Sequence, residues 1–203
     1  KYPVGCAATA GAIVMQYHGY PAKGTGSHSY KWDGKTLTAQ FEHEYDWANM
    51  PARYDGTNAA DFDGVARLMS DLGVAVDMQY AEDGSGSYIS DLVAAMQKYF
   101  GYSKISHQMS IEAGSAEEWN EKLRGEIDAN RPVLYAAFDS IGGGHAFVID
   151  GYKDDSFSVN WGWGGLCNGF YHIGALNPQN EEGKPVASRY NVGQMAVFGM
   201  EPS

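Results

Sequence analysis

The alternation of hydrophobic and polar positions predicts a helical first part and a β-rich second part of the chain. Residues 6–18 are mostly small or apolar on all sides, as in a helix that is buried all round. Gly19 and Pro21 follow this stretch, and both residue types are common at the end of a helix. We therefore expect a buried helix from Cys6 to His18.

Apolar residues at helical spacing predict three further helices. The first covers 58–72, and the second covers 91–100 with Ser90 as its cap. Ahead of the third, Ser115 and Glu118 form a capping box, a pairing that satisfies the free N–H groups of a helix start. We expect these helices to lie in the first two thirds of the chain.

Strands are expected in two places. A short one near 29–32 interrupts an otherwise irregular stretch over 20–56, which is rich in Gly, Ser, Thr, Tyr and Trp. After Pro132 the apolar residues recur at every second position, in segments separated by turn residues. These segments are 133–138, 145–152, 157–161, 170–173 and 195–200.

Helices first and antiparallel strands second are the order of an α+β protein. The chain of 203 residues is long enough for one domain with a sizeable core. We expect a single domain over 1–203, with a mainly helical lobe over 1–130 and a mainly antiparallel β lobe over 131–203. Two such lobes can form a cleft between them, where binding sites commonly lie.

Composition and charge exclude several classes of function. Hydrophobic residues make up 44% of the chain, which argues against disorder, and no apolar run is long enough to span a bilayer. The formal net charge is −11, so nucleic acids and anionic membranes are not expected partners. The first residues do not read as a signal peptide, and we expect a mature or trimmed chain.

The chain holds two cysteines, Cys6 and Cys167, which could form a disulfide. Cys6, however, begins the first predicted helix, where free N–H groups and the helix dipole favour a thiolate. Gly5 and Ala7 beside it leave room for a substrate carbonyl. An isolated cysteine among small residues is more often an inert core thiol, so this position alone does not establish a nucleophile.

A second motif contains a histidine and strengthens the argument for catalysis. His145 follows three glycines at the start of a buried strand, where an imidazole can serve as a general base. It lies 139 residues after Cys6, a separation typical of papain-type enzymes. The plain alternative is a histidine that simply begins a strand.

Asn160 and Trp161 lie fifteen residues beyond His145, at the end of the next strand. An amide there could hold the imidazole while an indole shields it from water, although Trp and Gly also cluster in ordinary tight turns. The order Cys6, His145, Asn160 is that of papain-like enzymes.

Several segments resemble the streptopain (C10) family of secreted bacterial peptidases. They are 5–10, 15–21, 45–47, 68–78, 143–151, 159–165 and 175–178, so the resemblance extends over nearly the whole chain. It implies a papain-like fold and an enzyme that is made as a zymogen. It also implies Cys6 as nucleophile and His145 as base, with Asn160 and Trp161 supporting the imidazole. We expect Gly143 and Gly144 to contact the substrate, for which the resemblance implies an apolar second residue before the cleaved bond.

The chain departs from the family pattern in three places. The family carries an oxyanion-hole glutamine upstream of the nucleophile, whereas only five residues precede Cys6 here. We expect that donor from an upstream segment, the propeptide or another chain, and losing such a donor typically costs about 10²–10³ in rate. One more glycine than expected precedes His145, which could lengthen the loop. The stretch 178–193 is charged where the family has a glycine-rich loop.

The expected function is a cysteine endopeptidase that acts on proteins or peptides and is secreted or lies at the bacterial surface. No cofactor or metal is expected, since the remaining histidines lack metal-ligand spacing. Cys167 is interpreted as a free thiol in a turn. Two alternatives stay open: an acyl transferase of the transglutaminase type on the same fold, and an inactive binding module that has kept the fold.

Overall fold

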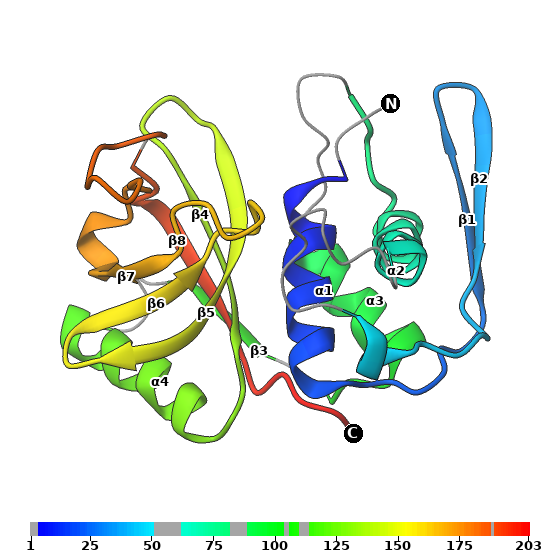
Figure 1. Cartoon of the computed structure of the whole chain (residues 1–203), viewed down its shortest axis with the longest axis horizontal. Coiled ribbons are helices and arrows are strands. Elements are labelled where there is room, and N and C mark those ends of the chain that lie inside the picture. Colours follow the sequence, from blue (N-terminus) through cyan, green and yellow to red (C-terminus); the bar gives the residue numbers. More distant parts are fainter. Residues whose placement is uncertain (1–3, 51–61, 82–88, 104–105, 110–113, 188) are drawn as a thin grey trace. The chain divides into compact units, whose positions relative to one another are not determined.

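The structure is a computed structural model that describes residues 4–50, 62–81, 89–103, 106–109, 114–187 and 189–203 (Figure 1). It consists of two compact units. The first contains Lys1–Ser103 with Glu201–Ser203, and the second contains Lys104–Met200. The division falls before the 130/131 boundary expected from the sequence, because the helix over 116–128 packs on the sheet of the second unit.

The first unit is built around α1 (Cys6–His18), whose bounds agree with the prediction. Its small residues allow close packing on other helices: a Cβ added at Gly11 would lie 2.8 Å from Leu92 Cδ1. The helix ends at Gly19, whose φ of 58° lies in the left-handed region that glycine enters without strain. α1 is therefore buried, as its composition predicts.

Two more helices complete this unit, α2 (Phe62–Ala75) and α3 (Ile89–Phe100). The predicted start of the former at 58–61 lies outside the described residues. α3 begins two residues earlier than predicted, because the buried Ile89 extends its apolar face. Ser90 therefore lies within the helix, and its prediction as the cap was wrong.

The first unit also contains a hairpin that the sequence indicated only in part. β1 (Ser27–Trp32) pairs antiparallel with β2 (Lys35–Gln40). Between them Asp33 and Gly34 both have positive φ, 49° and 72°. An Asp-Gly pair in that conformation makes the tight turn preferred in two-residue hairpins. One 3-10 turn follows, η1 (Trp47–Asn49).

The second unit contains an antiparallel sheet of six strands in the order β3-β8-β4-β5-β6-β7. The strands are β3 (Ser106–Met109), β4 (Val133–Phe138), β5 (Gly144–Lys153), β6 (Ser156–Asn160), β7 (Gly169–Tyr171) and β8 (Val192–Phe198). β3 was not predicted, whereas the other five overlap the predicted segments. A 3-10 turn, η4 (Ile173–Ala175), follows β7.

α4 (Ala116–Asp128) covers part of this sheet (Figure 1). The Ser115 half of the predicted capping box is confirmed, since the Ser115 side chain accepts a hydrogen bond from the Glu118 backbone N–H at 3.1 Å. Trp119 anchors the helix in the core, where its indole N–H donates to the Tyr135 hydroxyl. The α+β order, helices before antiparallel strands, is thus confirmed. Among the described residues, no helix has both the length and the apolar character needed to cross a bilayer.

Candidate active site

Cys6 is the first residue of α1 and is half-buried. The preceding Gly5 has φ 97° and ψ 141°, a conformation that is largely restricted to glycine. Its carbonyl accepts hydrogen bonds from the Thr9 backbone N–H at 3.2 Å and hydroxyl at 3.1 Å. No side chain caps this helix start, so its dipole favours negative charge beside Sγ.

His145 is the second residue of β5, and its ring has one hydrogen-bond partner among the described residues. Nε2 lies 2.8 Å from the backbone carbonyl oxygen of Trp161. Because a carbonyl only accepts, Nε2 must carry the proton. In the neutral ring Nδ1 is then the atom with a free lone pair, and is the one that can act as a base.

Aromatic rings enclose the imidazole of His145. Trp163 stacks on it with centroids 4.9 Å apart, and Phe147 and Trp161 lie nearly parallel to it at 5.7 and 6.2 Å. Burial lowers the pKa of His145 from its ordinary value of 6.5, while the bond to the Trp161 carbonyl acts in the opposite direction. The net direction favours the neutral, proton-accepting ring.

Asn160 and Trp161 occupy the end of β6, but they relate to the imidazole differently. The carbonyl of Trp161 receives the Nε2 proton. The Asn160 side-chain oxygen instead accepts from the Gly162 backbone N–H at 3.0 Å. That N–H and the Trp161 carbonyl belong to the same peptide group, so Asn160 holds the group whose oxygen contacts the ring.

The turn before His145 is organised by Asp139, a residue that the sequence interpretation missed. Its carboxylate accepts from the backbone N–H groups of Gly143 at 2.7 Å and Ile141 at 3.0 Å. A Cβ at Gly143 would lie 2.6 Å from this carboxylate. Gly142 has a φ of 91°. The run of three glycines before His145, one more than the family pattern has, therefore forms a compact turn. An aspartate shortly before a glycine run is the signal that could have indicated it.

Cys167 is a free, buried thiol whose pKa is raised by burial. Cys6 is free as well, so the structure contains no disulfide between them. The Cys167 backbone carbonyl accepts from the Trp161 indole N–H at 3.1 Å and from the Tyr171 hydroxyl at 2.6 Å. This residue therefore contributes to the site through its backbone.

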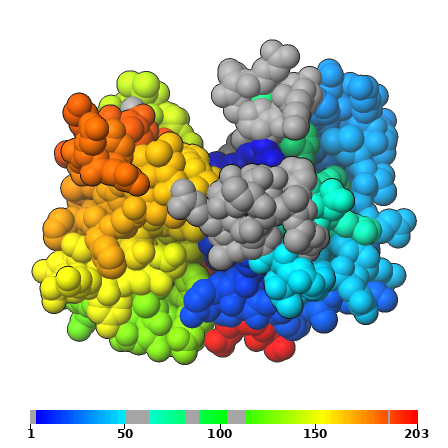
Figure 2. Space-filling view, in the orientation of Figure 1, coloured from blue at the N-terminus to red at the C-terminus, as the bar shows by residue number. Residues whose placement is uncertain are grey.

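The charged stretch over 178–193 brings a further ring to the imidazole. Tyr190 lies 5.5 Å from His145 and 5.9 Å from Trp161, centroid to centroid. The preceding residues form a turn in which the Asn180 side chain accepts from the backbone N–H groups of Glu182 and Lys184. Residues 181–186 are exposed and belong to the orange surface in Figure 2. The sequence held no local signal for the position of Tyr190.

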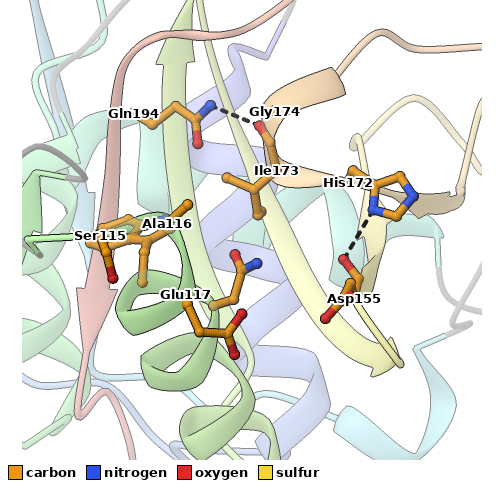
Figure 3. A pocket seen from close by; sticks show the side chains of 10 residues that line it. Ser115, Ala116, Glu117, Asp155, His172, Ile173, Gly174 and Gln194 are labelled. Carbon is orange, nitrogen blue, oxygen red and sulfur yellow. Dashed lines mark hydrogen bonds between the residues drawn. The ribbon is translucent and has the colours of Figure 1, made fainter.

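A cavity of about 460 Å³ lies elsewhere in the second unit, between the start of α4 and the stretch 172–174 (Figure 3). None of the predicted site residues lines it. Two of its polar side chains already have partners in the protein: Gln194 donates to the Ile173 carbonyl, and His172 contacts the Asp155 carbonyl. The described part of the chain also holds no group of three or more His, Cys, Asp or Glu that could bind a metal.

The predicted site residues are divided between the two units. Cys6 belongs to the first, and His145, Asn160 and Trp161 belong to the second. Within the second unit the last three form one hydrogen-bonded arrangement. Gly143 and Gly144 are exposed beside it.

Comparisons with known proteins give consistent matches. Residues 1–171 match the Peptidase C10 family. Streptopain from Streptococcus pyogenes is 35% identical over 209 residues, covering 98% of this chain and 52% of the relative. The thiol protease/hemagglutinin PrtT from Porphyromonas gingivalis is 34% identical over 206 residues, covering 98% of this chain and 24% of the relative. The chain thus spans about half the length of streptopain.

Solved structures agree with these matches. The active interpain A cysteine protease of Prevotella intermedia superposes with a TM-score of 0.87 and 37% identity, over 98% of this chain and 84% of that one. A prointerpain A fragment from the same organism gives a TM-score of 0.82 and 34% identity, over 100% and 65%. The resemblance and the papain-like α+β fold inferred from the sequence are confirmed.

Proposed function

Because the chain belongs to the peptidase C10 family, we propose that it is a cysteine endopeptidase with Cys6 as nucleophile and His145 as general base. The observation that supports this most strongly is the 2.8 Å contact between His145 Nε2 and the Trp161 carbonyl. It commits Nε2 to donating a proton and leaves Nδ1 to accept one. A base held in one tautomer is what nucleophilic catalysis requires.

In the proposed reaction, Nδ1 of His145 takes the proton from Cys6 Sγ, and the thiolate attacks the peptide carbonyl carbon. The Cys6 backbone N–H donates to the resulting oxyanion. The imidazolium gives its proton to the leaving amine as the C–N bond breaks, which leaves a thioester on Sγ. Water then attacks the thioester carbonyl while His145 accepts a proton from it. The C–S bond breaks, a carboxylic acid is released, and the imidazolium returns the proton to Sγ, which restores the Cys6 thiol.

Trp161 and Asn160 support the base in this scheme. The carbonyl of the first accepts the Nε2 proton, and the side chain of the second holds the adjoining Gly162 N–H. The C=O and the N–H of one peptide group are therefore both hydrogen-bonded. Each of these hydrogen bonds polarises the peptide group and so strengthens the other bond. The rings of Trp161 and Trp163 stack on the imidazole and shield it from water.

For substrate contact we propose the turn that precedes His145. Gly143 and Gly144 are exposed, so a substrate backbone can reach this turn. Phe138 and Ile141 in the same hairpin are also exposed, Ile141 to 87%. They offer an apolar surface to a substrate side chain, in keeping with the preference that the family resemblance implies.

The proposal extends to proteins or peptides as substrates, to synthesis as a longer precursor, and to secretion or surface localisation. The similarity to prointerpain A, a proform by its name, supports the precursor. The similarity to streptopain and to PrtT supports the substrates and the localisation. The oxyanion-hole glutamine that the resemblance implies stays a prediction.

Hydrolysis of casein and of a fluorogenic peptide tests the proposed function. We expect turnover by the unaltered protein and background rates for Cys6→Ala and His145→Ala, with folding of both variants verified by circular dichroism. Preferential transfer of the acyl group to an added primary amine would assign an acyl transferase instead. Hydrolysis that persists in Cys6→Ala would contradict the proposal.

A further inference from the structure

The turn between β6 and β7 is closed by hydrogen bonds from a single residue, Trp161. Its backbone N–H donates to the Asn168 side-chain oxygen at 3.0 Å. Its indole N–H donates to the Cys167 carbonyl at 3.1 Å. Trp161 is thus tied to two successive residues at the far end of the turn, one through its backbone and one through its side chain.

The backbone of this turn has little conformational preference of its own. Gly162, Gly164 and Gly165 have φ values of 79°, 64° and 93°, and glycine enters this region at the cost of a large entropy loss on folding. Backbone bonds within the turn run from the Leu166 N–H to the Trp163 carbonyl and from the Asn168 N–H to the Gly165 carbonyl. The two bonds of Trp161 add to these by joining the start of the turn to its end.

Two anchors together determine the direction of the Trp161 carbonyl. Asn168 holds the peptide group before Trp161 through its N–H. Asn160 holds the following peptide group through the Gly162 N–H. With both groups fixed, the torsion angles of Trp161 are fixed, and its carbonyl oxygen points at His145 Nε2.

We propose that Asn168 is a positioning residue of the active site: by holding the Trp161 N–H it fixes the carbonyl that keeps His145 in its Nε2–H tautomer. This inference rests on the proposed role of His145 as general base. Asn168 does not contact the imidazole and is itself exposed, so its effect is transmitted through Trp161. Loss of the anchor lets the carbonyl turn away, and the Nδ1–H tautomer, which cannot accept the thiol proton, becomes populated.

Nitrogen-15 NMR of the His145 ring in a Cys6→Ala background measures this tautomer without any need for activity. We expect a single Nε2–H tautomer in the parent and a mixture after Asn168→Ala. Asn168→Asp keeps an acceptor oxygen in place and should restore the single tautomer. Asn180→Ala is the matched control, because Asn180 also caps backbone N–H groups of a turn but none next to the ring.

Kinetics with Cys6 present supply the second readout. For Asn168→Ala we expect kcat to fall about tenfold, the order expected for one hydrogen bond lost, with KM nearly unchanged. Asn168→Asp should recover most of kcat. If Asn168→Ala does not fold, Asn168→Ser carries the same expectation, because its shorter side chain withdraws the acceptor from the Trp161 N–H.

A single Nε2–H tautomer in the Asn168→Ala protein would overturn the inference, as would equal losses in Asn168→Ala, Asn168→Asp and Asn180→Ala. Failure of the proposed function looks different. In that case Cys6→Ala retains hydrolysis, while the tautomer of His145 still responds to Asn168. The two claims can thus be contradicted separately.

Discussion

At the residue scale, the imidazole of His145 is subject to two opposing influences. Burial among aromatic rings disfavours the charged imidazolium and lowers its pKa. The hydrogen bond from Nε2–H to the Trp161 carbonyl acts in the opposite direction and raises the pKa. Burial is the larger influence, so the pKa is lowered. A nearby thiolate would act against this effect, which makes the Cys6→Ala protein the appropriate one in which to observe it.

We predict that His145 in Cys6→Ala titrates below 6.5, the ordinary value for histidine. Because its pKa is lower in the folded than in the unfolded state, its contribution to the free energy of unfolding is complete above 6.5 and is lost as the pH falls through the folded pKa. Proton NMR titration gives the pKa, and urea unfolding at pH 7.5 and 5 gives the linked change. A His145→Gln control should show a weaker dependence on pH; a pKa above 6.5 would contradict the prediction.

The sequence indicates the proposed reactive residues better than their proposed supports. Cys6 and His145 could be proposed from the sequence because a helix start and a glycine run are local features. The roles of Tyr190 and Asn168 depend on contacts with residues that are distant in sequence or across a glycine turn. The role of Asp139 could have been proposed in part from the sequence, because its hydrogen bonds span only four residues and the residues around it are typical of an Asx turn.

At the scale of the element, α1 depends on close approach to α3. A Cβ at Gly11 would meet Leu92 Cδ1 at 2.8 Å, whereas a Cβ at Gly125, in the interior of α4, would meet nothing within 4 Å. The same substitution should therefore have opposite effects in the two helices. This contrast separates helix propensity from packing.

We predict that Gly11→Ala lowers the free energy of unfolding by about 1–3 kcal/mol, the usual range for overpacking a core. Gly125→Ala should raise it by about 0.5–1 kcal/mol, because alanine is the better helix former. Equilibrium denaturation in urea measures both changes. Equal stabilisation by the two substitutions would show that α1 does not pack tightly against Leu92.

Element boundaries show what a single sequence can and cannot specify. α1 and the cap of α4 were predicted correctly because both are marked by residues with defined backbone roles, Gly19 and Ser115. The hairpin over 27–40 was predicted only in part, although Asp33-Gly34 is a strong turn signal. β3 has four residues and gains its stability by pairing with β8, which local periodicity does not reveal.

At the scale of the whole molecule, catalysis as proposed requires groups from both compact units. Cys6 comes from the first unit, and His145 with its Trp161 support comes from the second. The central claim is that Nδ1 of His145 activates the Cys6 thiol. Cys167 provides an internal reference within the same chain, because it is buried and its pKa is raised by burial.

The most direct test is the rate of alkylation of each thiol by iodoacetamide, located by peptide mass mapping in the unaltered protein and in His145→Ala. The account predicts rapid modification of Cys6, slow modification of Cys167, and selective loss of the Cys6 rate in His145→Ala, since the thiolate is the reactive form. Even modification of both thiols, with no response to His145→Ala, would contradict it.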